Sequence, residues 1–327
     1  DLTNTIFTDS NKARILESVT AFNEQERLFV FRNLTVLGAL KDDALQIALA
    51  DKSYLIRLIA ARGIGQLTDS RTISHLLKDR SQRIRSYAIE HIEQARLLEH
   101  KAEVHRLLFD SSAWIRSKAR IMCANLWNYD IVEEYRLQIN VIPNVGSIIG
   151  LSEVGNQSDT SKFFPILNSI SAKMRAAALV AISNLDYVLA KEKAFQFLED
   201  NSNFVKRTCC NIILKSKTAD DLPRLRSIYS SGGSDTKRFV LRIISAFGGW
   251  SIAGDFIKAL TENDEMLRNS AATYLDAWYR YSVRLGTQKT DSDKDYVLSV
   301  YQELDKEGLS IPYSTKGILD ELPFIFK

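Results

Sequence analysis

The stretch from Asp51 to Leu67 reads DKSYLIRLIAARGIGQL and contains a motif that recurs along the chain. The motif is an acidic residue, a basic residue six positions later and a small residue three positions after that. Its clearest copies are Asp51, Arg57, Ala60; Asp79, Arg85, Ala88; and Asp110, Arg116, Ala119. Later copies are Ser169, Arg175, Ala178; Asp200, Lys206, Cys209; and Glu262, Arg268, Ala271. A motif that returns at a fixed interval indicates a stack of similar units.

The basic position of the motif gives the period of the repeat. We call the basic residue of each copy its anchor. Looser copies of the motif add one anchor before Arg57 and one between Lys206 and Arg268. The interval from Arg116 to Arg175 is about twice the usual step, so a degenerate copy is placed within it at a serine. The anchors are then Arg27, Arg57, Arg85, Arg116, Ser147, Arg175, Lys206, Arg238 and Arg268. Successive anchors are 28 to 32 residues apart, which predicts nine repeats of about 30 residues.

Composition and charge are those of an ordinary folded protein. Of 327 residues, 45% are hydrophobic and 25% charged, and the net charge is only +3, so bulk charge argues neither for nor against a nucleic-acid partner. The three cysteines imply no disulfide framework and favour a reducing, cytoplasmic compartment. No run of 18 apolar residues is present, so we expect no membrane insertion. The chain begins with Asp1, which leaves open a soluble domain whose N-terminal signal or membrane anchor was trimmed.

Each repeat is expected to be a pair of helices. In the second repeat these are residues 42–49 and 55–67, and in the fourth they are 98–109 and 114–126. Apolar residues of the second helix recur one position before, three after and seven after the anchor, as in Ile84, Ala88 and Ile92. This spacing places them on one buried stripe of the helix.

Two segments depart from the pattern. Residues 141–155 lack the acid and the basic anchor and gain Gly146, Gly150 and Gly155; this segment is a degenerate repeat with a local kink, or else a hinge or close-approach surface for a partner. The chain then divides into a repeat array over residues 1–281 and a loop with a helical cap over residues 282–327. Solenoids need such a cap over their last core, although the apolar tail could also bind a partner.

The paired helices with Asp-x5-Arg-x2-Ala resemble HEAT repeats, in particular the short subtype named after the phycobilisome lyases. The resemblance implies an all-α fold, a right-handed α-solenoid of about nine two-helix repeats with a C-terminal cap. It also implies a structural ladder of hydrogen bonds between neighbouring repeats, in which Asp51, Asp79, Asp110 and Asp200 pair with Arg57, Arg85, Arg116 and Lys206. Arg175 and Arg268 occupy the same basic position, and the acid is replaced by Ser169 and Gly232 in two repeats.

We find no catalytic or metal-binding pattern and expect no cofactor. The four histidines, His75, His91, His100 and His105, lack zinc spacing and are expected to be solvated. No catalytic triad elbow, phosphate loop or dinucleotide fingerprint is present.

Two sets of polar residues are candidates for partner binding. Amides recur nine positions after the anchor in five consecutive repeats, at Gln66, Gln94, Asn125, Asn156 and Asn184; they either complete helix C-termini or read an extended peptide backbone. Basic residues flank the ladder positions at Arg62, Arg83, Lys118, Arg120, Lys173, Arg207, Lys237 and Arg242. These either form an ordinary solvated face or line a groove for an acidic partner or a nucleic-acid backbone.

The sequence therefore predicts a non-enzymatic scaffold that binds another protein along the concave face of the solenoid. A nucleic-acid-binding protein similar to the HEAT-like DNA glycosylases is the first alternative, and it would need aromatic residues in the groove. A bilin lyase-type subunit is the second, and it is implied only by the repeat subtype.

Overall fold

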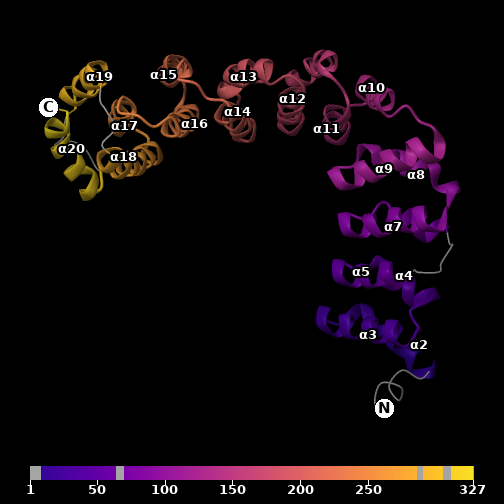
Figure 1. Ribbon diagram of the computed structural model, residues 1–327. Coiled ribbons are helices and arrows are strands. Elements are labelled where there is room, and N and C mark those ends of the chain that lie inside the picture. Colours follow the sequence, from indigo (N-terminus) through magenta and orange to yellow (C-terminus); the bar gives the residue numbers. More distant parts are fainter. Residues whose placement is uncertain (1–8, 64–69, 286–289, 305–310, 327) are drawn as a thin grey trace. The chain divides into compact units, whose positions relative to one another are not determined.

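The computed structural model describes residues 9–63, 70–285, 290–304 and 311–326, and helices without any β-strand make up the secondary structure of these ranges. The chain separates into two compact units, an N-terminal unit, Asp1–Val154, and a C-terminal unit, Gly155–Lys327. Each is a stack of paired helices (Figure 1), which confirms the predicted HEAT-like α-solenoid fold.

The helices of the N-terminal unit follow the predicted pairs. The second helices, which carry the anchors, are α3 (Glu24–Val36), α5 (Tyr54–Gly63), α7 (Gln82–Ala95), α9 (Ala113–Trp127) and α11 (Val145–Val154). The first helices are α2 (Asp9–Ser18), α4 (Asp42–Ala50), α6 (Ser70–Leu76), α8 (Lys101–Arg106) and α10 (Ile131–Val141).

The C-terminal unit repeats this order. Its second helices are α12 (Ala172–Leu185), α14 (Asn203–Lys215), α16 (Ser234–Ser245) and α18 (Glu265–Leu285). The first helix before α12 is replaced by two 3-10 helices, η4 (Gln157–Phe163) and η5 (Pro165–Asn168). The remaining helices are α13 (Tyr187–Gln196), α15 (Asp221–Ser231), α17 (Ile252–Leu260), α19 (Asp291–Gln302) and α20 (Tyr313–Ile325).

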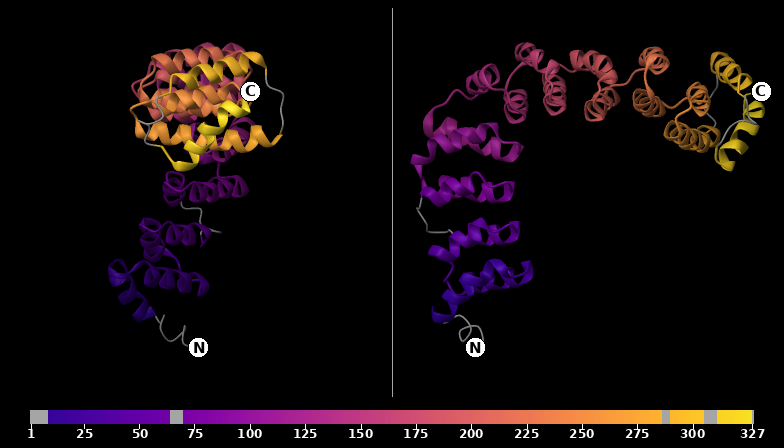
Figure 2. Two further views of the ribbon diagram at one scale, coloured as in Figure 1. Left: turned by 90° about the vertical axis from the view of Figure 1, so that its left-hand side faces the viewer. Right: turned by 180° about the vertical axis from the view of Figure 1, so that it is seen from behind.

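Within each unit the second helices form one continuous row. Helix α5 contacts α3 and α7, and α7 contacts α9; in the other unit, α14 contacts α12 and α16, and α16 contacts α18. Figure 2 shows these rows from two further sides. The side chains of the predicted apolar stripe, such as Ile84, Ala88 and Ile92, are buried. Burying one isoleucine of this kind stabilises the fold by roughly 1.5–3 kcal/mol.

The anchors form a ladder of buried ion pairs between consecutive repeats. The Arg57 guanidinium donates from Nε to the Asp79 carboxylate at 2.7 Å and from Nη1 to the backbone carbonyl of Asp51 at 2.8 Å. One arginine therefore joins the loop of its own repeat to the acid of the next. The same type of pair recurs as Arg27–Asp51, Arg85–Asp110 and Arg175–Asp200.

Each ladder aspartate also holds the start of its own second helix. The Asp79 carboxylate accepts a hydrogen bond from the backbone N–H of Ser81 at 2.7 Å, and Asp51, Asp110 and Asp200 accept in the same way from Ser53, Ser112 and Ser202. Burial raises the pKa of the Asp79 carboxyl, but the hydrogen bonds from Arg57 and Ser81 outweigh it, and the net pKa lies below the ordinary 3.8. The ionised form is therefore the stable one.

This geometry corrects the pairing that the resemblance implied. Each acid accepts from the arginine of the preceding repeat, whereas the arginine of its own motif reaches only its backbone carbonyl. Arg116 differs again, because its carboxylate partner is Glu153, at 3.2 Å from Nε. Glu153 also accepts from Arg120, so one glutamate on α11 replaces the missing aspartate of the degenerate repeat.

Two further anchors are placed differently from the prediction. In α16 the ladder residue is Lys237, whose ammonium lies 2.8 Å from the Glu262 carboxylate, whereas Arg238 pairs with Asp235 on its own helix. Lys237 also has the buried stripe at the expected spacing, which makes it the anchor. With Lys237 as the anchor, the acid position of this repeat is Ser231 and not Gly232 as predicted, so the buried Lys206 meets no ladder acid there. Arg268 donates to the carbonyls of Glu262 and Asn263.

The glycines of the degenerate repeat allow close packing within the N-terminal unit. A β-carbon on Gly146 would lie 1.9 Å from the Phe109 carbonyl oxygen, and one on Gly150 would lie 2.2 Å from the Tyr135 ring. The Tyr135 hydroxyl donates to the Leu108 carbonyl at 2.7 Å. Gly146 and Gly150 thus allow α11 to pack closely against Phe109 and Tyr135. Both glycines are buried, so they do not form a surface for a partner.

The C-terminal helices cover the last repeat. Phe326, which directly follows α20, is buried against Trp250 and Trp278, with ring centroids 5.6 and 6.3 Å away. On α19, the Tyr296 hydroxyl donates to Asp255 at 2.9 Å. The apolar tail therefore packs mainly on its own chain. Helix α18 continues to Leu285, past the predicted boundary after residue 281, and the division into array and cap stays a prediction.

The three cysteines are buried in the core as free thiols, as expected of small apolar residues. Burial raises the pKa of Cys123 and of Cys210 to about 12 each. The thiolate forms are therefore strongly disfavoured in the folded protein.

Replacing one ladder arginine should destabilise the protein strongly. Arg57→Ala leaves the buried Asp79 carboxylate without its ion-pair partner, which costs about 3 kcal/mol and lowers the thermal unfolding midpoint of the N-terminal unit. The exposed pair Arg280–Asp276 is the control; Arg280→Ala should cost less than about 1 kcal/mol. Equal midpoints for the two variants, measured by circular dichroism, would contradict the ladder's role.

The ladder also predicts acid sensitivity. Because the pKa of Asp79 is lower in the folded than in the unfolded protein, its stabilising contribution is complete above the unfolded value of about 3.8 and is lost as the pH falls through the folded value. Asp79→Asn should lower the unfolding midpoint at pH 7 and flatten its decline between about pH 4 and pH 2. Midpoints measured across that range test this; parallel curves for the variant and wild type would show that Asp79 contributes nothing.

Two glycines should respond oppositely to the same substitution. Gly146→Ala should lower stability by at least about 2 kcal/mol, because the new methyl group collides with backbone that cannot rotate away. Gly317→Ala, in α20, meets no atom within 4 Å and should stabilise by about 0.5–1 kcal/mol. Denaturant midpoints distinguish the two, and a neutral Gly146→Ala would overturn the close-packing account.

Candidate functional site

The surface left free by packing is the outward face of each row of second helices. Counted from the anchor, the positions −1, 0, +3 and +7 face the core, so −2, +5 and +9 lie on the opposite side of the helix. Position +1 lies at the edge of that side; it is buried in Leu58 and Ala176 and exposed in Arg207. Exposed residues at these four positions define the outward face. Neighbouring second helices are in contact, so their outward faces are adjacent within each unit.

Large apolar side chains lie exposed on this face. At position −2 are Trp114, 45% exposed, and Phe204, 53% exposed, and at the same position in α18 is Met266. Position +5 adds Ile121 and Val180. The repeat motif does not single out these residues because it is defined by the packing positions; an apolar residue out of register with the stripe is the signal that would have found them.

In the N-terminal unit two of the four predicted basic residues are neutralised by glutamates of the chain itself. Lys118 pairs with Glu93 at 2.6 Å and Arg120 with Glu153 at 2.5 Å. Arg83 is exposed near the start of α7. These cations therefore do not combine into one basic groove.

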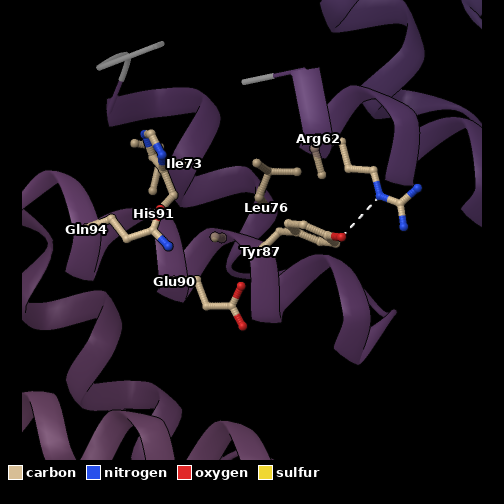
Figure 3. A pocket seen from close by; sticks show the side chains of 9 residues that line it. Arg62, Ile73, Leu76, Tyr87, Glu90, His91 and Gln94 are labelled. Carbon is tan, nitrogen blue, oxygen red and sulfur yellow. Dashed lines mark hydrogen bonds between the residues drawn. The ribbon is translucent and has the colours of Figure 1, made fainter. Parts of the chain in front are cut away.

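Arg62 and Gln94 line a cavity of about 210 Å³ between α5, α6 and α7 (Figure 3). Arg62 Nε donates to the Tyr87 hydroxyl at 3.1 Å, and its guanidinium lies 5.6 Å from the centre of the Tyr87 ring. Glu90 and His91 of α7 complete the polar lining. The cavity joins one predicted basic residue to one predicted amide.

The other amides do not form a continuous row. Asn125 is exposed on α9 and Asn184 near the end of α12, in different units. Asn156 instead begins η4 through a capping box with Asp159. Gln66 lies outside the described residues. The C-termini of α7 and α9 are completed by Arg96 and Asn128 in the left-handed conformation, so Gln94 and Asn125 are not C-cap residues.

The C-terminal unit retains more free positive charge. Lys173, Arg207 and Arg242 are exposed on α12, α14 and α16. Lys237 belongs to the ladder and is paired.

The histidines were predicted to be solvated, and this is wrong for two of them. His100 is 1% exposed, and its Nε2 atom has no hydrogen-bond partner among the described residues. His105 pairs with Glu134 at 2.7 Å and lies against Tyr129. His75 is exposed and His91 lines the cavity.

Within the described ranges, His, Cys, Asp and Glu residues nowhere gather into a group of three or more suited to a metal ion. None of the helices in the described part of the chain has the length and apolar character that a bilayer crossing requires.

Comparison with known proteins identifies neither a matching family model nor a matching curated protein. Solved structures with a similar fold include a Kap95p complex with RanGDP, at 11% identity and a TM-score of 0.44, covering 98% of this chain and 51% of that one. The chain thus spans about half the length of that neighbour. The Escherichia coli protein YibA matches at 17% identity, TM-score 0.31, covering 84% and 95%. The CpcE–CpcF complex of Nostoc phycocyanin lyase matches at 14%, TM-score 0.27, covering 80% and 92%. At these identities the likeness concerns the repeat architecture alone.

Proposed function

We propose that the protein is a non-enzymatic scaffold that binds another protein along the outward faces of its second helices. The observation that carries this proposal is the set of large apolar side chains exposed there, out of register with the core. Trp114 and Phe204 lie at the same motif position in the two units, with about half of each side chain exposed. Aromatic side chains held on rigid helices are the residues that most often dominate protein interfaces.

The arrangement supports a protein partner over duplex DNA. In the N-terminal unit Lys118 and Arg120 are already paired with glutamates, which would oppose a phosphate backbone. Trp250 and Trp278 are buried beneath the C-terminal cap, so they do not supply the groove aromatics of a glycosylase-like site. Binding by many modest contacts over stacked helices needs no catalytic centre.

Truncating the exposed aromatics should weaken partner binding without unfolding the protein. We expect wild-type protein to capture a stoichiometric protein from its native lysate, with capture surviving nuclease and high salt. Trp114→Ala and Phe204→Ala should each weaken binding of that partner by about tenfold or more, as expected of interface aromatics. Val188→Ala, on the first helix α13 and 78% exposed, is the control and should change nothing.

Two results would contradict the proposal. If nucleic acid is recovered instead and salt releases it, the nucleic-acid alternative is correct. If a protein partner binds Trp114→Ala, Phe204→Ala and Val188→Ala equally well, the outward face is not where it binds.

A further inference from the structure

The second helices of the C-terminal unit carry a one-sided distribution of charge. Helices α12, α14 and α16 contain eight lysine and arginine residues and only one acidic residue, Asp235. The whole chain, by contrast, has 43 basic and 40 acidic residues. The excess of positive charge on these three adjacent helices is therefore a local feature.

Half of these cations are used by the fold. Arg175 pairs with Asp200, Lys237 with Glu262 and Arg238 with Asp235, and Lys206 is buried beside the ladder. The other four are exposed and lie at outward positions: Lys173 at −2, Arg207 at +1, Arg242 at +5 and Lys215 at +9. We call these four residues the basic face.

The residues between these cations are apolar or amide rather than acidic. Phe204 and Val180 are exposed at outward positions, and Asn211 lies one turn after Arg207 on the same side of α14. The single acid, Asp235, is held by Arg238 and also accepts a hydrogen bond from Asn203. Nothing on the outward faces of α12 and α14 offsets the positive charge.

We infer that the basic face binds an acidic, extended segment of a partner protein that also presents an apolar side chain to Phe204. The inference rests on the proposed scaffold function and names the chemistry of the partner. Arginine pairs with carboxylates through two parallel hydrogen bonds, so Arg207 and Arg242 would fix the position of the segment. Lys173 and Lys215 would add attraction that salt screens.

The spacing favours a peptide over a nucleic-acid strand. Helices pack 8–10 Å apart, so three of them span about 20 Å, which about six residues of extended chain cover. Side chains of such a segment alternate in direction, so about three of the six would point toward the basic face. A nucleic-acid strand carries a charge on every nucleotide and would set phosphates against Phe204, Val180 and Asn211 as well.

A random peptide display library tests the inference without assuming the partner. Peptides about twelve residues long, panned on the full chain, should become enriched in Asp and Glu with one large apolar residue. The charge reversals Arg207→Glu with Arg242→Glu should weaken the best selected peptide by about tenfold or more in fluorescence anisotropy. Lys173→Glu with Lys215→Glu is a second pair, in case the first does not fold.

Lys258→Glu with Lys316→Glu is the matched control. Both lysines are exposed, on α17 and α20, so the change in net charge is identical but lies outside the basic face. We expect unchanged peptide binding by this variant. Wild type should bind the short acidic peptide more weakly as salt rises, whereas a whole partner that also makes apolar contacts to the outward face should stay bound.

Three outcomes would overturn the inference: selection of neutral or basic peptides, equal loss of binding in the control, or displacement of the peptide by a single-stranded oligonucleotide at lower concentration than by a free acidic peptide. The scaffold function is judged separately. A lysate partner that binds wild type and Arg207→Glu/Arg242→Glu equally refutes the basic face alone, whereas capture of no protein partner refutes the scaffold function.

Discussion

The arginine that bridges two repeats is the interaction on which the rest of the structure depends. Arg57 binds the loop carbonyl of its own repeat and the carboxylate of the next, and that carboxylate in turn accepts from the backbone N–H of Ser81, which directly precedes the following helix. One side chain thus sets the position of two loops and the start of a helix. Because each link involves only neighbours, stability is a sum of local terms along the chain.

In the repeat that lacks the ladder aspartate, other contacts hold the second helix in place. In the degenerate repeat the acid is lost, and α11 is instead held by Glu153, which accepts from two arginines, and by glycines that let backbone approach backbone. The exchange keeps a charge-assisted contact, now made by a glutamate in place of the aspartate, and adds a steric contact that tolerates no small shift. The strict requirement for glycine at Gly146 follows from this exchange and not from any need for flexibility.

The repeat and its helices could be predicted from the sequence because packing imposes them in every copy. The direction of the ladder could not be predicted, since Asp79 is only 6 residues from the arginine of its own motif, Arg85, yet its carboxylate pairs with Arg57, which is 22 residues away. From the sequence, the anchor of α16 is assigned to Arg238 instead of Lys237 because two basic residues are adjacent there. Only the positions that are buried in the structure show that Lys237 is the anchor. The acids that neutralise Lys118 and Arg120 lie on α7 and α11, so the pairing of those cations depends on three-dimensional neighbours.

Within each repeat some positions of the second helix serve packing and others face outward, and only the outward positions are free to differ between repeats. Positions −1, 0, +3 and +7 are committed to the core and the ladder, so in the regular repeats they are similar and do not distinguish one partner from another. The outward positions bear no such constraint, and there the two units diverge. In the N-terminal unit α9 presents Trp114 and Ile121 beside two cations that are paired with glutamates, whereas in the C-terminal unit α14 presents Phe204 beside the exposed Arg207. These two helices therefore expose chemically different surfaces of the same fold, and under the proposed scaffold function the two surfaces would favour partner segments of different charge.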